Sequence, residues 1–370
     1  MDVGEIVRRL HWRAWDPDAP APEVSIGEVV AALPVLIESG SAGVVWPRLR
    51  DVIGADHPAG MALEAAAASQ AAHNARAERE LARVVGRLRE AGVEPVLIKG
   101  LAVARIYPAG LVRPAGDLDL VVRDEDYTAA IEALAGWRLS FHRDVAAKRA
   151  YDADRDREIV PLGDVDLHSA SKWYGSRDNA RFFAEAQMAV LGDAGDAVEV
   201  RVPRVEDHLR ALCLHFLRHG AVRPVRLCDI ALLVERYGAD LAWDRMLTGS
   251  RSQVEQVGVA IRLAEELLDA RVADAPILPL PAWIGSAVNQ QWAENKTPNG
   301  NPQGVAKRMG HIRKPAVDPI TLRIRTAGVY SDIPMLLLRL WYYAEKILGL
   351  PMRPLLAKRS MSFCHIRSWT

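Results

Sequence analysis

The stretch that decides the fold is Asp117-Leu118-Asp119-Leu120-Val121-Val122, in which acidic and apolar side chains alternate before an apolar end. Successive side chains of a β-strand point to opposite faces, so the stretch predicts a strand with Asp117 and Asp119 together on one face. Two neighbouring carboxylates on a buried strand repel each other, and a divalent cation removes that cost. Mg²⁺ favours one or two carboxylates plus substrate phosphate oxygens. The stretch therefore predicts a metal site, and the alternative is a strand end whose acids face water.

A second strand is predicted just upstream, over the short apolar run Glu94–Ile98, and it ends at Lys99-Gly100. A glycine lets the backbone approach a phosphate, and a helix over Leu101–Ile106 can direct its positive N-terminal end at that anion. This turn is therefore a candidate phosphate site. The alternative for Lys99 is a solvated lysine at the strand end.

A third carboxylate is predicted downstream, in the alternating run Val165-Asp166-Leu167-His168. Three carboxylates can hold two metal ions, and the third acid can also act as general base toward an acceptor. Asp164 shares a face with Asp166, so periodicity does not choose between them. His168 lies on the same face, either as a metal or substrate contact or as a hydrogen-bonded structural histidine.

The organisation of the chain follows from its helical patterns. Its 370 residues are 50% hydrophobic, which is ample for one large domain or two ordinary ones. We expect an N-terminal helical segment (1–60), an α/β core (61–200), a helical domain (201–288), a loop or linker (289–315) and a C-terminal helical segment (316–370). The predicted helices are Gly4–Trp12, Ile26–Ile37, Ala62–Ala91, Tyr127–Ala135, Val205–Arg218, Leu227–Tyr237, Trp243–Ser250, Val254–Leu268 and Met335–Leu348, and further strands are predicted at Arg138–Arg143 and Glu158–His168.

Charge and composition narrow the function classes. Lys plus Arg and Asp plus Glu are equal at 47 each, so the chain has no global field that would gather nucleic acid. The N-terminus lacks a signal-peptide apolar region, and no stretch approaches the ~20 apolar residues of a membrane span. Three cysteines without CxxC spacing are typical of reduced thiols. We therefore expect a cytoplasmic protein with no membrane partner.

Histidines and arginines concentrate after residue 204. His215 and His219 have the i, i+4 spacing of metal ligands but lack the glutamate of a zinc-protease motif, so His215 is expected to face the cleft of the candidate phosphate site or to bond Asp229. Asp229 lies on an apolar helix and needs a partner, for which His215 and Arg226 are candidates. The arginine-rich range 204–226 indicates a solvated helix face or a cleft wall that binds phosphate.

Together these motifs resemble the uncharacterised nucleotidyltransferase family of the DNA polymerase β superfamily, over roughly residues 65–275. A single Gly100 after Lys99 departs from the Gly-Gly or Gly-Ser pair that is commoner in the superfamily. The motifs that carry the resemblance are Val96-Leu97-Ile98-Lys99-Gly100, Tyr107, Arg113, the stretch from Asp117 to Val122, Val165-Asp166-Leu167-His168, His215, Leu227-Cys228-Asp229-Ile230-Ala231 and Trp243.

The resemblance implies an α+β fold: a polymerase β-like nucleotidyltransferase core, with a small mixed sheet and flanking helices, plus an all-helical C-terminal domain. It implies a nucleoside monophosphate transferred from an NTP such as ATP, with release of pyrophosphate and with Mg²⁺, or alternatively Mn²⁺, as cofactor. By the same resemblance, Asp117, Asp119 and Asp166 bind metal and carry catalysis, and the nucleotide and its phosphates are contacted by Lys99, Gly100, Arg113, His168 and His215. Arg113 alternatively pairs with Asp117.

The acceptor is not readable from the motifs, and a small molecule, a peptide or a protein all fit. Family members are often found near peptide natural-product genes, which suggests that setting without fixing the acceptor. Two other functions are consistent with the chain: a degenerate nucleotide-binding module that regulates or scaffolds a partner, and a toxin-like enzyme that modifies RNA. The intact Asp117, Asp119 and Asp166 argue against the first, and zero net charge argues against the second.

Overall fold

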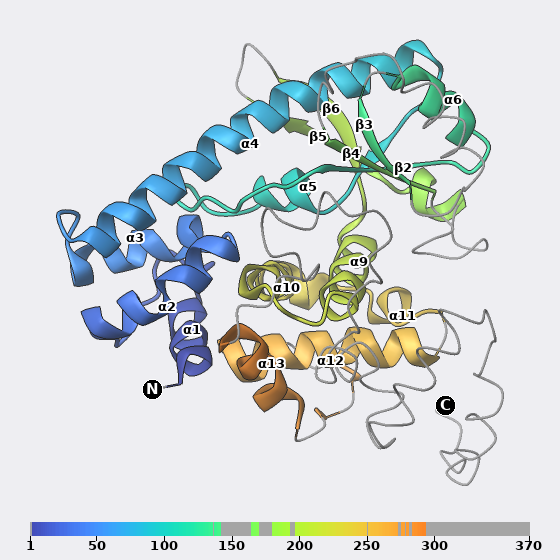
Figure 1. The fold of residues 1–370 in the computed structure, drawn as a ribbon. Helices are drawn as coiled ribbons and strands as arrows, with labels where there is room; N and C mark the ends of the chain where they lie inside the picture. Colours follow the sequence, from blue (N-terminus) through green and yellow to red (C-terminus); the bar gives the residue numbers. More distant parts are fainter. Residues whose placement is uncertain are drawn as a thin grey trace, which may run out of the picture.

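The computed structural model describes residues 2–135, 137–141, 164–169, 180–192, 197–249, 251–272, 275–277, 279–280 and 283–293. Figure 1 shows a sheet on one side of the molecule and a group of helices on the other, with the long helix α4 running from the N-terminal helices across the sheet. The helices are α1 (Val3–His11), α2 (Ile26–Glu38), α3 (Ala42–Ile53), α4 (Pro58–Glu90), α5 (Gly100–Ala104), α6 (Tyr127–Ala133), α9 (Val205–Arg218), α10 (Pro224–Tyr237), α11 (Trp243–Met246), α12 (Arg251–Leu268) and α13 (Ile284–Ala293), with a 3₁₀ turn at Gly238–Asp240.

The described strands form one mixed sheet of six, in the order β3-β4-β2-β1-β6-β5. β2 lies between β4, to which it is parallel, and β1, to which it is antiparallel, and β5 pairs antiparallel with β6 at one edge. Every residue of β2 is buried. The strands are β1 (Val96–Leu97), β2 (Leu118–Val122), β3 (Arg138–Phe141), β4 (Asp164–Ser169), β5 (Gln187–Leu191) and β6 (Val198–Val202).

The two faces of the sheet pack into two different hydrophobic clusters. Leu120 and Val122 join residues of α4, among them Leu81 and Val84, in one cluster. Val121, on the opposite face of β2, belongs to the cluster formed with the N-terminal helices and with α9, α10 and α12. Because side chains alternate along a strand, Asp119 shares the face of Val121, toward the helices.

The N-terminal helices are part of that larger cluster. α1 packs on α13, α2 and α10, and α3 packs on α4. His11 is fully buried; its Nδ1 lies 2.7 Å from the carbonyl oxygen of Val7, and its Nε2 lies 2.7 Å from the hydroxyl of Ser41. The segment 1–60 therefore shares its core with the C-terminal helices.

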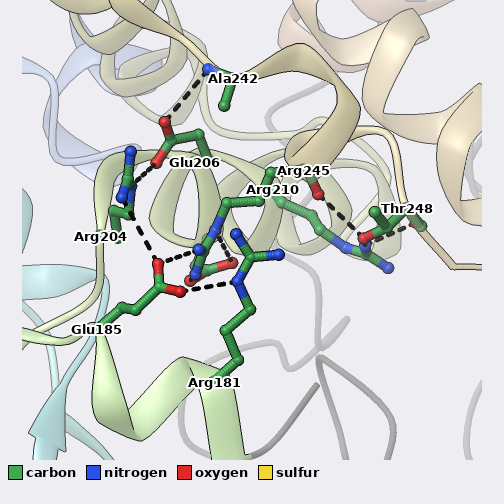
Figure 2. A network of polar contacts seen from close by, with 9 residues as sticks. Arg181, Glu185, Arg204, Glu206, Arg210, Ala242, Arg245 and Thr248 are labelled. Atoms are coloured by element: carbon green, nitrogen blue, oxygen red, sulfur yellow. Dashed lines mark hydrogen bonds and ion pairs between the residues drawn. The ribbon is translucent and has the colours of Figure 1, made fainter. Parts of the chain in front are cut away.

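An ionic network ties the sheet side to the helices (Figure 2). Glu185, which precedes β5, forms an ion pair with Arg245 of α11 and lies 3.5 Å from Arg204, just before α9. Arg245 pairs also with Asp207 of α9. Since Arg245 and Asp207 are buried, the network holds α9 and α11 against the segment that leads into the sheet.

Several element boundaries differ from the sequence expectations. The loop expected from Asn289 is wrong at its start, because α13 continues to Ala293. Trp292 is fully buried there and donates from Nε1 to the carbonyl oxygen of Ala221 at 2.8 Å. The strand expected from Glu158 is described only from Asp164, and residues 294–370, with the helix expected at Met335–Leu348, lie outside the described residues. Among the described helices, none is long and apolar enough to cross a membrane.

Candidate active site

The register of two parallel strands brings two carboxylates together. Asp119 of β2 pairs with Asp166 of β4, and both side chains are buried. His168, two residues further along β4, lies with Nε2 3.0 Å from Oδ1 of Asp119 and 3.1 Å from Oδ2 of Asp166. Asp166, rather than Asp164, is thus the residue opposite Asp119.

Asp117 lies just before β2, because the strand that the sequence predicts from Asp117 begins one residue later, at Leu118. The residue is exposed at the edge of the site, yet the protein packed around its carboxyl group raises its pKa, and the negative charges of Asp119 and Asp166 raise it further. The three carboxylates are therefore close enough for their charges to affect one another.

Lys99 is buried beside these acids in an unusual backbone conformation. Its φ of 56° lies in the left-handed region that few residues other than glycine adopt. Its ammonium group forms an ion pair with Asp119, and its backbone N–H donates to Nε2 of His208 at 3.0 Å. The alternative of a solvated strand-end lysine is therefore wrong.

His208 accepts that bond as a neutral imidazole. Burial, with the nearby charges of Arg105, Arg113 and Lys99, lowers the pKa of His208 to about 3. A neutral ring can accept a hydrogen bond at one nitrogen, whereas an imidazolium cannot. The contact therefore fixes the turn at Lys99 without adding a charge to the site.

Arg113 is held by Asp229 of α10, and Asp229 is completely buried. The guanidinium donates to both carboxylate oxygens, from Nε at 3.0 and 3.2 Å and from Nη2 at 2.6 Å. The hydroxyl of Tyr107 donates to Oδ1 of Asp229 at 2.9 Å. The expected pairing of Asp229 with His215 or Arg226 is therefore wrong, and so is the alternative pairing of Arg113 with Asp117. Asp229 is buried and instead accepts hydrogen bonds from Arg113 and Tyr107, which face it from the segment before β2.

A cavity of about 600 Å³ opens in front of the carboxylates. This volume is within the range of small-molecule sites. His215 lies on its wall, with its ring centroid 4.3 Å from that of His219, whereas His168 is behind the carboxylates and does not line it. The lining residues are Glu38, Ser39, Gly40, Lys99, Gly100, Arg113, Pro114, Ala115, Gly116, Asp117, Asp119, Asp166, Leu212, His215, Arg218, His219, Val225, Arg223 and Arg226.

The donor set at the base of the cavity fits a divalent cation. Asp119, Asp166 and His168 each offer a ligand atom, and these atoms lie within 4.8 Å of one another. Carboxylate oxygens suit Mg²⁺ and Mn²⁺, and an imidazole nitrogen is a common ligand of transition metals. Asp117 is not in this group, although its carboxylate lies in the same cavity wall.

Part of the cavity comes from residues that sequence reasoning did not single out. Glu38 ends α2, Ser39 and Gly40 follow it, and all three reach the cavity from the N-terminal segment, where Gly40 has a φ of 79°. No motif or periodicity marks them, because their role depends on a chain reversal far from the acidic stretch. The positive φ at Gly40 marks that reversal, and a glycine is a recognisable but unspecific signal of one.

Comparison with known proteins gives one family and one structural likeness. The model of a family described as "Uncharacterised nucleotidyltransferase" matches residues 10–269, which include the whole sheet and the cavity. The chain is also similar to the solved structure of an antigenic nucleotidyltransferase-like protein from Paracoccidioides brasiliensis, with 13% sequence identity and a TM-score of 0.34 over 55% of this chain and 95% of that one. The search of curated proteins gives no match.

Proposed function

The chain belongs to the uncharacterised nucleotidyltransferase family, and we propose that it transfers a nucleoside monophosphate from an NTP to an acceptor with release of pyrophosphate. One observation carries this proposal: Asp119 and Asp166 lie opposite each other on adjacent central strands, beside His168, at the base of a cavity. Phosphoryl transfer depends mostly on positioning and on neutralising phosphate charge, and this arrangement supports both.

The carboxylates have the central role in the proposed reaction. We assign Asp117, Asp119 and Asp166 to divalent metal ions, which would neutralise phosphate charge when bound. His168 contacts both Asp119 and Asp166, so it holds the two carboxylates in fixed positions and adds a possible nitrogen ligand. The acceptor oxygen would form a bond to the α-phosphorus while the bond to the β-phosphate oxygen breaks. The acceptor proton would pass to Asp166 as general base.

The residues around the carboxylates would hold the nucleotide. Gly100 lines the cavity at the start of α5, where its backbone can lie against the triphosphate. The cations of Lys99 and Arg113 are held by Asp119 and Asp229, and they would offset phosphate charge from those fixed positions. His215 lies on the opposite wall, where it would contact the nucleotide.

A labelling experiment tests the reaction class. The protein is incubated with Mg²⁺ and with NTPs labelled at the α- or the γ-phosphate, in the presence of small-molecule, peptide and protein acceptor pools. We expect α-label to enter an acceptor with equal release of pyrophosphate, and γ-label to remain in pyrophosphate. Transfer of γ-label instead would identify a kinase-type reaction, and nucleotide binding without any transfer would favour the regulatory module.

Substitution of one acid tests the site. Asp119→Asn keeps the shape of the side chain and removes its charge, so transfer should fall ~10³-fold through loss of several kcal/mol of charge stabilisation. Asp124→Asn is the matched control, because this exposed acid follows the same strand and does not line the cavity. Circular dichroism should show both variants folded, and full activity of folded Asp119→Asn would refute the proposed metal site.

A further inference from the structure

The two walls of the cavity carry opposite charges. Asp117, Asp119 and Asp166 lie on the sheet side, at β2 and β4. Arg218, Arg223 and Arg226 lie on the helical side, at the end of α9 and the start of α10. In Figure 1, α9 and α10 lie between the sheet and α12, as this arrangement requires. Lys99 and Arg113 also line the sheet side, where each is paired with an acid. A ligand that spans the cavity therefore meets the acids at one end and three further guanidinium groups at the other.

Arg226 has a buried donor that the described protein does not use. Its Nη1 has no hydrogen-bond partner among the described residues. Burial, together with the positive charges of Arg223 and Arg113, lowers the pKa of Arg226 to about 10, so the group is still a cation at neutral pH. A buried guanidinium nitrogen without an acceptor is costly, and an anionic ligand removes that cost.

The acid best placed to neutralise Arg226 is already occupied. Asp229 follows Arg226 by three residues on α10, a spacing at which side chains of a helix are neighbours. Both oxygens of Asp229 accept from Arg113, and one accepts also from Tyr107. Asp229 and Asp119 therefore attract Arg226 without a direct hydrogen bond, and Nη1 of Arg226 keeps no acceptor among the described residues.

The N-terminal end of α10 adds to the same positive field. Arg223 is the residue before the helix, its side chain makes no capping bond, and Pro224 occupies the first turn. No hydrogen bond or ion pair holds the Arg223 side chain within the described residues, and the residue is exposed on the cavity. The start of a 14-residue helix carries a partial positive charge that favours anions.

We propose that Arg223, Arg226 and the N-terminal end of α10 bind the β- and γ-phosphates of the NTP, opposite the carboxylates. The inference rests on the proposed nucleotidyl transfer and names the part of the donor that this wall holds. The α-phosphate must lie at the carboxylate end, where the reaction occurs, so the β- and γ-phosphates extend from it into the cavity, where the arginines attract their negative charge. Lys99 and Arg113 form ion pairs with Asp119 and Asp229, whereas neither Arg223 nor Arg226 forms an ion pair within the described residues.

Isothermal titration with Mg²⁺ and three probes tests the assignment: inorganic triphosphate, ATP and AMP. Arg226→Met should weaken triphosphate and ATP binding ~10- to 100-fold, the usual effect of losing charge-assisted hydrogen bonds, and leave AMP binding within about two-fold. Arg223→Met should act in the same direction. Arg83→Met is the control, because that arginine is 64% exposed on α4 and does not line the cavity.

Thermal unfolding separates binding from folding. Arg226→Met removes a buried guanidinium nitrogen that has no acceptor among the described residues, so its Tm should equal or exceed that of the wild type while its affinity for triphosphate falls. Unchanged ATP affinity in this variant, equal losses for AMP and ATP, or a wild type that does not bind triphosphate would each overturn the assignment. A wild type that binds triphosphate through Arg226 but transfers no nucleotide would refute the proposed reaction alone. Transfer by Arg226→Met with an unchanged KM for the NTP would refute only the assignment of the β- and γ-phosphates to Arg223, Arg226 and the start of α10.

Discussion

At the scale of single residues, the turn between β1 and α5 combines a strained backbone with direct contacts to the acidic site. Lys99 adopts a left-handed conformation that typically costs a residue other than glycine ~1–3 kcal/mol, and it is held there by Asp119 and His208. The next residue, Gly100, has ordinary negative φ, so backbone strain does not explain why it is glycine. A side chain at this position would project without a clash, since a Cβ would meet only the carbonyl oxygen of Asp117 at 3.5 Å.

Gly100→Ala therefore separates binding from stability. We expect the free energy of unfolding to change by no more than ~1 kcal/mol, because the added methyl group has room and alanine suits a helix. We expect ATP affinity to fall by ~10-fold, because the methyl group displaces phosphate from the backbone. Urea denaturation and calorimetric titration measure the two quantities. An unchanged ATP affinity would remove Gly100 from the phosphate site.

Only some of the contacts between single residues at the site can be predicted from the sequence. Alternation along β2 and β4 predicts that Asp119 and Asp166 face the same side, and the strand register places them opposite each other. The ion pair of Lys99 with Asp119 has no such signal, because it depends on a turn conformation that residue identity does not encode.

At the scale of elements, α10 joins the acidic site to the helical side. Asp229 is completely buried on this helix and binds Arg113 and Tyr107, which lie 116 and 122 residues earlier in the chain. Contacts at such separation leave no periodic trace in the sequence. Periodicity predicts that α10 is an apolar helix and that Asp229 needs a partner. It does not predict that the partners are Arg113 and Tyr107.

Asp229→Asn should destabilise the protein by about 3–5 kcal/mol, because it leaves the guanidinium of Arg113 buried without its counter-charge. The double variant Arg113→Met/Asp229→Leu should recover part of that loss, since it removes both charges. Chemical denaturation measures these differences. Glu64→Gln supplies the comparison, because its exposed pair with Arg50 should contribute no more than ~1 kcal/mol. A loss of less than ~1 kcal/mol in Asp229→Asn would show that the buried pair of Arg113 with Asp229 stabilises the fold no more than an exposed pair does.

At the scale of the whole molecule, the sequence predicts the fold class correctly. Long periodic segments such as α4, α9 and α12 are recognisable, and the acidic strand and the family resemblance indicate the nucleotidyltransferase core. The pair β5–β6, the helix α3 and the common core of the N- and C-terminal helices are not predicted. They depend on packing between distant segments, which residue patterns do not specify.

Stability of the whole protein should fall as the pH decreases below 6.5. Burial lowers the pKa of His11 to about 4 and that of His208 to about 3, so the unfolded chain binds protons that the folded chain does not. Stability from these groups is complete above the unfolded pKa and is lost as the pH falls toward the folded values. Each fully uncompensated histidine contributes a slope of about 1.4 kcal/mol per pH unit.

His11→Gln tests this linkage. Its free energy of unfolding should depend less steeply on pH between 6 and 5 than that of the wild type, by up to about 1.4 kcal/mol per pH unit. Urea denaturation at several pH values gives the slope independently of any overall loss of stability. An identical slope in the two proteins would show that His11 is not a buried neutral histidine.

The division of the cavity between sheet and helices has a consequence for recombination among relatives. The acids come from residues 117–166, whereas the arginines come from residues 218–226, so a crossover in the loop that joins β6 to α9 separates the two sets. A hybrid protein built at that point would inherit the acids of the cavity from one parent and its arginines from the other. Such a hybrid must keep Glu185 with a matching Arg245, because this ion pair crosses the junction. A series of such hybrids would vary what the helices bind while the acidic strands stay the same.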